Sequence, residues 1–261
     1  MAEAETLHTA QRGGVLTLTL DRPKANAFDL PLVDALVEAF KRAESDGSVR
    51  CVVLTGAGRV FSAGQDVTAL DVRNGYVSFR HHLERTYNRL IMRMRSLEKP
   101  VIGAINGAAA GAGLGVALAT DVRIAAASAR FVFAFTGIGL TADSGTSLML
   151  PLLIGLARAN EMAFTNSPLS AEQALDYGLV NRVVPDDQLA SAAAELADSL
   201  ASGPTRALGL TKRAFFHAML SSLPAALEYE AHLQEIAGRT EDHREGVKAF
   251  LEKRTPSYRG A

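Results

Sequence analysis

The chain has 261 residues, which is long enough for one large domain or for one domain with an appendage. Hydrophobic residues make up 48% and charged residues 21%, the profile of a globular protein with a sizeable core. A net charge of −1 gives no electrostatic sign of nucleic acid or of an anionic membrane as a partner, and we expect neither.

The single cysteine, Cys51, excludes an intrachain disulfide and a cysteine-based zinc site. It stands in the apolar run "RCVVLTG", so we expect a buried thiol rather than a nucleophile. The N-terminal "MAEAETLHTAQRG" lacks the basic-then-apolar pattern of a secretory signal, and we expect a cytoplasmic protein.

The first part of the chain alternates predicted strands with predicted helices. "GGVLTLTLDRP" has the alternation of a strand. "DLPLVDALVEAFKRAESDG" has helical spacing, with Asp29 as the expected N-cap and Gly47 past the end. "VRCVVLTGAG" predicts a strand buried on both faces, and "YNRLIMRMRSLEKP" predicts a helix that ends at Pro100.

Further along, "PVIGAINGA" predicts a strand and a turn, "GLGVALATD" a helix, and "VRIAAASARFVFAF" mainly strand. "SLMLPLLIGLARANEMAFTN" predicts a helix with a proline kink. A capping box of Ser170 and Gln173 opens a short helix that Gly178 closes, and from about Asp186 the pattern is helical. This order predicts an α/β core with much parallel pairing, followed by a helical last third that packs on its own core or builds an oligomer interface.

The glycine-rich stretch "GAAAGAGLGVALATD" has three interpretations. A dinucleotide fingerprint needs a third glycine where Val116 or Leu118 stands, and Asp121 comes too early for its acidic residue. A membrane span over 101–120 would be charge-free but poor in large apolar residues and without aromatic belts. A helix N-terminus with small side chains offers backbone N–H groups, which suits an oxyanion hole as well as a phosphate cradle.

A second loop of small residues, "GAGRVFSAGQD", follows the buried strand "CVVLTG". Either loop alone would be interpreted as a plain surface turn. Two such loops about 45 residues apart, each after a buried strand, favour a shared site.

Several stretches resemble the successive motifs of the crotonase superfamily, also called the enoyl-CoA hydratase/isomerase family: "LDRPKANAF", "VVLTGAGRVFSAGQD", "KPVIGAINGAAAGAG", "ATDVRIAAASARF" and "SAEQALDYGLVNRVVP". The ending "EGVKAFLEKRTPSYRG" matches its C-terminal signature. The resemblance implies an α/β fold with a crotonase-like ββα spiral core over residues 1–195 and a C-terminal helical trimerisation region over residues 196–261. It implies a homotrimer or a dimer of trimers, an acyl-CoA substrate, no cofactor beyond the coenzyme A of that substrate, and no metal.

The resemblance also implies site residues. Two backbone N–H groups hold the thioester oxygen in this family, and they fall on Gln65 and Ala112. The two glutamates of a family hydratase fall on Gly115 and Phe135, which cannot transfer protons, so efficient two-glutamate hydration is not expected.

Asp143 in "GLTADSGTS" stands where isomerase branches of the family carry a catalytic aspartate. The chain looks most like the branch that isomerises ring-epoxide or β,γ-unsaturated acyl-CoA esters in phenylacetate degradation. The hypothesis is that Asp143 moves a proton between two carbons, while Phe135 keeps the pocket dry and raises the aspartate pKa. The alternative from the residues alone is that Asp143 caps the following helix beside Ser144.

Further alternatives stay open. They are a water-assisted enoyl-CoA hydratase, an inactive crotonase-fold scaffold, and an aryl-CoA dehalogenase in which Asp143 is a nucleophile. In the dehalogenase branch a tryptophan and a histidine assist, but their registers fall on Phe135 and Asn88. A serine nucleophile at Ser144 lacks the G-x-S-x-G flanks.

The family implies that residues from five segments contact coenzyme A or substrate. These are Lys24, Ala25, Ala27, Ala63, Gly64, Asp66, Gly111, Phe135, Phe250 and Lys253, the last two acting on a neighbouring subunit. For His81 and His82 a solvated helix face is favoured over a base or a ligand. The loop 67–90 carries no motif that identifies the acyl chain.

Overall fold

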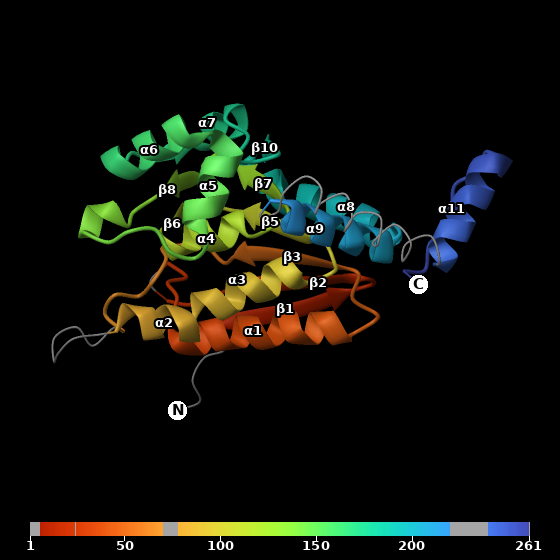
Figure 1. Cartoon of the computed structure of the whole chain (residues 1–261), viewed down its shortest axis with the longest axis horizontal. Helices are drawn as coiled ribbons and strands as arrows, with labels where there is room; N and C mark the ends of the chain where they lie inside the picture. The colour runs from red at the N-terminus through yellow and green to blue at the C-terminus, as the bar shows by residue number, and fades with distance from the viewer. Residues whose placement is uncertain (1–5, 24, 70–77, 220–239, 261) are drawn as a thin grey trace.

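The computed structural model describes residues 6–23, 25–69, 78–219 and 240–260 (Figure 1). Its larger sheet has six strands in the order β1-β2-β3-β5-β7-β10, antiparallel at the first pair and parallel at the rest. The strands are β1 (Leu7–Arg12), β2 (Val15–Leu20), β3 (Cys51–Gly56), β5 (Val101–Ile105), β7 (Val122–Ala126) and β10 (Arg182–Val184).

A smaller sheet has the order β4-β6-β8-β9. Its strands are β4 (Val60–Ser62), β6 (Ala108–Ala110), β8 (Arg130–Val132) and β9 (Leu169–Ser170). The chain visits the larger sheet and then the smaller one three times, as β3–β4, β5–β6 and β7–β8, with helices between these visits. This path is the ββα spiral that the family resemblance implied.

Helices cover both faces of the larger sheet. On one face lie α1 (Leu30–Ser45) and α3 (Tyr87–Ser96), and on the other lies α8 (Leu189–Ser202) (Figure 1). Along β3, Val52 and Leu54 belong to the hydrophobic core beneath α1 and α3, whereas Cys51 and Val53 belong to the core beneath α8. The prediction of a strand buried on both faces is therefore confirmed. Burial raises the pKa of the Cys51 thiol to about 12, as expected for an inert cysteine.

Local signals placed several helix ends correctly. The Asp29 side chain accepts a hydrogen bond from the Leu32 N–H at 3.0 Å and caps α1. The predicted capping box of Ser170 and Gln173 opens α7 (Ala171–Asp176).

Three elements differ from prediction. β1 was not predicted, and β6 occupies the place of an expected turn because it pairs with β4 and β8, far away in sequence. The expected kinked helix is two helices, α5 (Thr146–Ile154) and α6 (Leu156–Thr165). The break comes at Gly155, whose φ of 80° and ψ of 152° lie outside the helical region, rather than at Pro151 inside α5.

The last part of the chain is helical, with α9 (Thr205–Ala218) beside α8 and α11 (Glu241–Glu252) standing away from the core (Figure 1). Arg50 ties the tail to the core, because its guanidinium donates to the Tyr258 carbonyl and to Thr205 Oγ1. The predicted boundary after residue 195 falls inside α8 and stays a prediction. Across the described ranges, no helix combines the length and the apolarity that a bilayer crossing requires. The charge-free stretch 101–120 forms β5, β6 and the short helix α4 (Ala112–Leu118).

Candidate active site

The two loops of small residues meet, as the sequence predicted. A Cβ atom added to Gly64 would lie 2.6 Å from the Ala110 carbonyl oxygen and 3.2 Å from the Ala112 nitrogen. A Cβ at Gly113 would lie 2.5 Å from the Ser62 carbonyl oxygen. Such distances exclude any side chain, so the glycines allow the start of α4 to approach the end of β4.

Two backbone N–H groups are left without an acceptor at this contact. Phe28 pairs with both neighbours of Gln65, since its N–H donates to Gly64 at 2.7 Å and its carbonyl accepts from Asp66 at 2.8 Å. Because β pairing alternates along a chain, the N–H of Gln65 faces the other side. Ala112 is the first residue of α4 and has no intrahelical acceptor. Within the described residues, neither N–H donates a backbone hydrogen bond.

Asp143 lies in the turn before α5. The only hydrogen bond found for its side chain in the described part of the chain comes from Ser144 Oγ, at 2.6 Å from Oδ1. α5 begins at Thr146 without a side-chain cap, so the alternative that Asp143 caps this helix is wrong. Burial raises the pKa of Asp143 above its ordinary value, and the Ser144 hydroxyl partly offsets this rise.

Gly115 packs directly on this turn. A Cβ at Gly115 would lie 2.4 Å from Ser144 Cβ, 2.8 Å from the Ser144 carbonyl oxygen and 3.0 Å from Thr146 Oγ1. The first expected glutamate position is therefore sterically closed as well as lacking a carboxylate. Gly115 follows Ala112 by about one helical turn, so α4 carries both the Ala112 N–H and the contact with the turn that contains Asp143.

Phe135 lies beside the start of α4. Phe135 is buried, and its ring meets that of Phe133 edge to face, with centroids 5.0 Å apart. A Cβ at Gly111 would lie 4.0 Å from the Phe135 ring. The structure thus places Phe135 and Gly111 together at the N-terminus of α4.

Comparison with known proteins agrees with this architecture. Residues 10–261 match the family described as "Enoyl-CoA hydratase/isomerase". The chain belongs to this family. It is 46% identical to 1,2-epoxyphenylacetyl-CoA isomerase of Escherichia coli (strain K12), over 95% of each chain, and 43% identical to a "Probable enoyl-CoA hydratase" of Rhodobacter capsulatus, also over 95% of each. The crystal structure of an enoyl-CoA hydratase from Bacillus anthracis matches with a TM-score of 0.92 at 35% identity, covering 98% of this chain and 100% of that one. The protein is accordingly a crotonase-fold enzyme of the acyl-CoA class.

Sequence reasoning missed two residues of this enoyl-CoA hydratase/isomerase. Tyr87 Oη lies 2.6 Å and His82 Nε2 lies 3.0 Å from Gln65 Oε1. The favoured interpretation of a solvated helix face is therefore wrong for His82, which is half-buried, although His81 is exposed. No motif links residues that lie 17 and 22 positions apart in the sequence, so no sequence signal pointed to this contact.

The expected coenzyme A residues fall into three groups. Ala25 and Ala63 are exposed and joined by a 3.0 Å backbone hydrogen bond, with the buried Ala27 close by in sequence. Asp66 is buried, and its carboxylate is already bound by Arg22 and Thr68. Lys24 and the Phe250 side chain lie outside the described residues, and Lys253 follows α11, a helix that stands apart from α4 (Figure 1).

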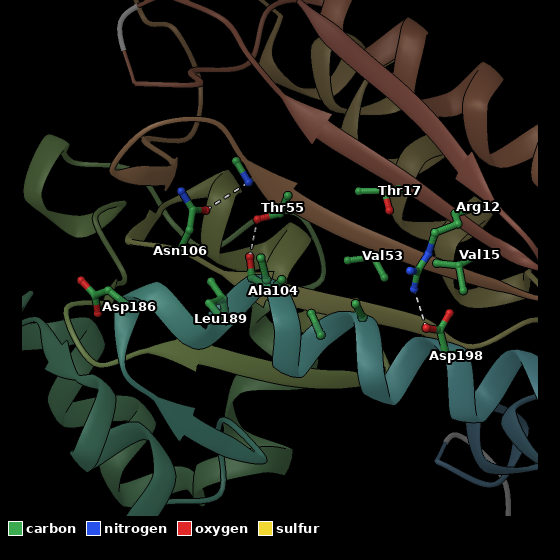
Figure 2. A pocket seen from close by; sticks show the side chains of 14 residues that line it. Arg12, Val15, Thr17, Val53, Thr55, Ala104, Asn106, Asp186, Leu189 and Asp198 are labelled. Carbon is green, nitrogen blue, oxygen red and sulfur yellow. Dashed lines mark hydrogen bonds and ion pairs between the residues drawn. The ribbon is translucent and has the colours of Figure 1, made fainter.

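A separate cavity of about 440 Å³ lies between α8 and the larger sheet (Figure 2). Small and aliphatic side chains form most of its wall, and an ion pair of Arg12 and Asp198 stands at one end. Its polar Thr55 and Asn106 side chains already bond to backbone groups. None of the predicted site residues lines it. Among the described residues, no three His, Cys, Asp or Glu side chains gather as a metal site.

Proposed function

We propose that the protein is an enoyl-CoA isomerase in which Asp143 removes a proton from one carbon of the acyl chain and returns it to another. The Gln65 and Ala112 N–H groups would hold the thioester oxygen while an enolate forms. The same carboxylate would then deliver the proton at the second carbon, so that the double bond moves and no other reactant is consumed.

The observation that carries this proposal is the setting of Asp143. In the described part of the chain it is a partly buried carboxylate with one hydrogen-bond donor, in a turn that packs against α4, the helix whose first residue is Ala112. Burial moves its pKa toward neutrality, which suits a group that must both accept and donate a proton. The relative named as an isomerase, at 46% identity, supports the same reaction class.

The proposal includes the remaining expectations. Coenzyme A enters as part of the substrate, with no additional cofactor. The substrate would contact Ala25, Ala27, Ala63 and Gly64. In a homotrimer or a dimer of trimers, Phe250 and Lys253 would approach the coenzyme A of a neighbouring subunit.

A water-assisted hydratase is the second candidate, favoured by the relatives named as hydratases at 43% and 35% identity. Against it stands the closed position at Gly115, where a water-activating glutamate has no space.

The test is a proton-transfer assay. The wild-type protein and Asp143→Asn are incubated in heavy water with a 3-enoyl-CoA and, separately, with a 2-enoyl-CoA. The proposal expects the conjugated ester with deuterium incorporated, and loss of both in the variant. Hydration of the 2-enoyl ester without dependence on Asp143 would select the hydratase. If neither substrate is converted, a simple enoyl isomerase is rejected. Halide release from a 4-halobenzoyl-CoA would then identify Asp143 as a nucleophile.

A further inference from the structure

The side chain of Gln65 is fixed at both ends of its amide. Its Oε1 accepts from the hydroxyl of Tyr87 at 2.6 Å and contacts His82 Nε2 at 3.0 Å. Its Nε2 donates to the Asp66 carbonyl at 3.1 Å. Because an amide oxygen only accepts, His82 must carry its proton on Nε2 for this contact to be a hydrogen bond.

The two donors come from different helices. Tyr87 is the first residue of α3, is 1% exposed, and packs its ring edge-on against Phe28 at 5.9 Å. His82 belongs to α2 (Phe79–Arg85), and its ring meets that of Tyr87 at 6.0 Å. Burial lowers the pKa of His82, which favours the neutral ring.

The Gln65 backbone is held as tightly as its side chain. Phe28 binds the carbonyl of Gly64 and the N–H of Asp66, the peptide groups on either side. The Gln65 N–H shares a planar trans peptide with the Gly64 carbonyl, so the bond from Phe28 sets its general direction. Small rotations of this peptide about its Cα–Cα axis would still tilt the N–H, and the anchored Gln65 side chain opposes them. Each anchoring bond from Tyr87 or His82 therefore acts on the direction of that N–H.

We propose that Tyr87 and His82 are positioning residues that hold the Gln65 N–H in line with the thioester oxygen of the substrate. This rests on the proposed function, in which that N–H is one of two donors to the developing enolate. A misdirected donor weakens the transition state more than the bound ester, so loss of either positioning residue lowers kcat more than it raises KM.

The experiment uses Tyr87→Phe, which removes only the hydroxyl, and His82→Leu, which removes the ring donor. His82→Gln supplies an amide donor as a rescue variant, and the exposed His81→Leu is the matched control on the same helix. We expect kcat to fall about two- to tenfold in each of the first two variants, the range of one hydrogen bond. His82→Gln recovers part of the loss, and His81→Leu behaves as wild type.

A second readout does not need turnover. Bound 4-dimethylaminocinnamoyl-CoA absorbs at longer wavelength when its carbonyl accepts hydrogen bonds. We expect a red shift with the wild type, a smaller shift with Tyr87→Phe and His82→Leu, and the full shift with His81→Leu. Melting temperatures near the wild-type value would separate this effect from unfolding. If Tyr87→Phe does not fold, the half-exposed His82 still provides the comparison.

The outcomes separate the two proposals. A wild-type shift that both variants retain in full, with kcat unchanged, overturns the positioning role and leaves the isomerase standing. A shift that both variants reduce, in a protein inactive on 3-enoyl-CoA, supports the positioning role and rejects the isomerase. Absence of any wild-type shift means that there is no carbonyl-binding pair, and the inference falls with it.

Discussion

The loops that carry Asp66 and Asp143 both pack against the segment that contains α4, but the structure treats the two carboxylates in opposite ways. Asp66 is 8% exposed and accepts from Arg22 at 2.9 Å and from the Thr68 N–H and hydroxyl at 3.0 and 2.6 Å, which hold its pKa at about 2. Asp143 is also partly buried, but among the described residues its side chain has a single donor, Ser144, and its pKa is raised. A carboxylate that is bound by several donors is held ionised and stabilises its loop, whereas one with few donors can still exchange a proton.

Asp143→Asn should have the largest effect on activity. We expect turnover to fall by about 10²–10⁴-fold, the usual contribution of a general base. The free energy of unfolding at pH 7 should stay equal or rise, because the substitution removes a charge that burial disfavours. Kinetics and urea unfolding on the same preparation would check both. A variant that loses stability together with activity would place Asp143 among the structural residues.

Asp66→Asn should show the reverse pattern. Arg22 would lose one of its two carboxylate partners in a largely buried network with Asp29, and we expect a loss of about 2–4 kcal/mol in unfolding free energy. Asp34→Asn is the matched control, since its ion pair with Arg89 is about half exposed and worth about 0–1 kcal/mol. Equal effects of the two substitutions in urea unfolding would contradict the structural role of Asp66.

Gly115→Ala tests how closely the Asp143 turn is packed. The new methyl group would meet the Ser144 Cβ and carbonyl oxygen, so we expect a loss of about 1–3 kcal/mol from overpacking and a displaced Asp143. Gly47→Ala is the control, because nothing lies within 4 Å of its added Cβ. Calorimetry of the two variants would settle the difference. If Gly115→Ala were as stable as the wild type, the turn at Ser144 would have to move aside at little cost.

The smallest effect is in the pH dependence. Asp66, with a folded pKa of about 2, contributes stability that is complete above pH 3.8 and is lost as the pH falls toward 2. Asp143 has the opposite sign: stability falls as the pH rises from 3.8 through its raised pKa, while kcat/KM rises over the same limb. Carboxyl carbon NMR titration of both groups would check the order. If Asp66 and Asp143 titrated with the same midpoint, the proposed difference between the two carboxylates would be wrong.

Much of the frame could be predicted from the sequence because its signals are local. The Asp29 cap, the capping box at Ser170 and the doubly buried β3 depend on neighbours within a few residues. The meeting of the two glycine loops followed from the resemblance and from small residues after buried strands. The role of Gly115 was underestimated, because its contact with Ser144 bridges 29 positions. The contacts of His82 and Tyr87 with Gln65 likewise depend on how α2 and α3 dock, which no periodicity encodes.

The buried Cys51 can serve as a built-in probe of local unfolding. With one cysteine in the whole chain, in the middle of the larger sheet and with a pKa near 12, the folded protein should ignore thiol reagents. Reaction with a disulfide reagent would then record only those moments when β3 separates from α8. Because Cys51 does not react in the folded protein, a cysteine introduced at exposed position 81 could be labelled with a fluorophore selectively. No native residue of the core would have to be replaced.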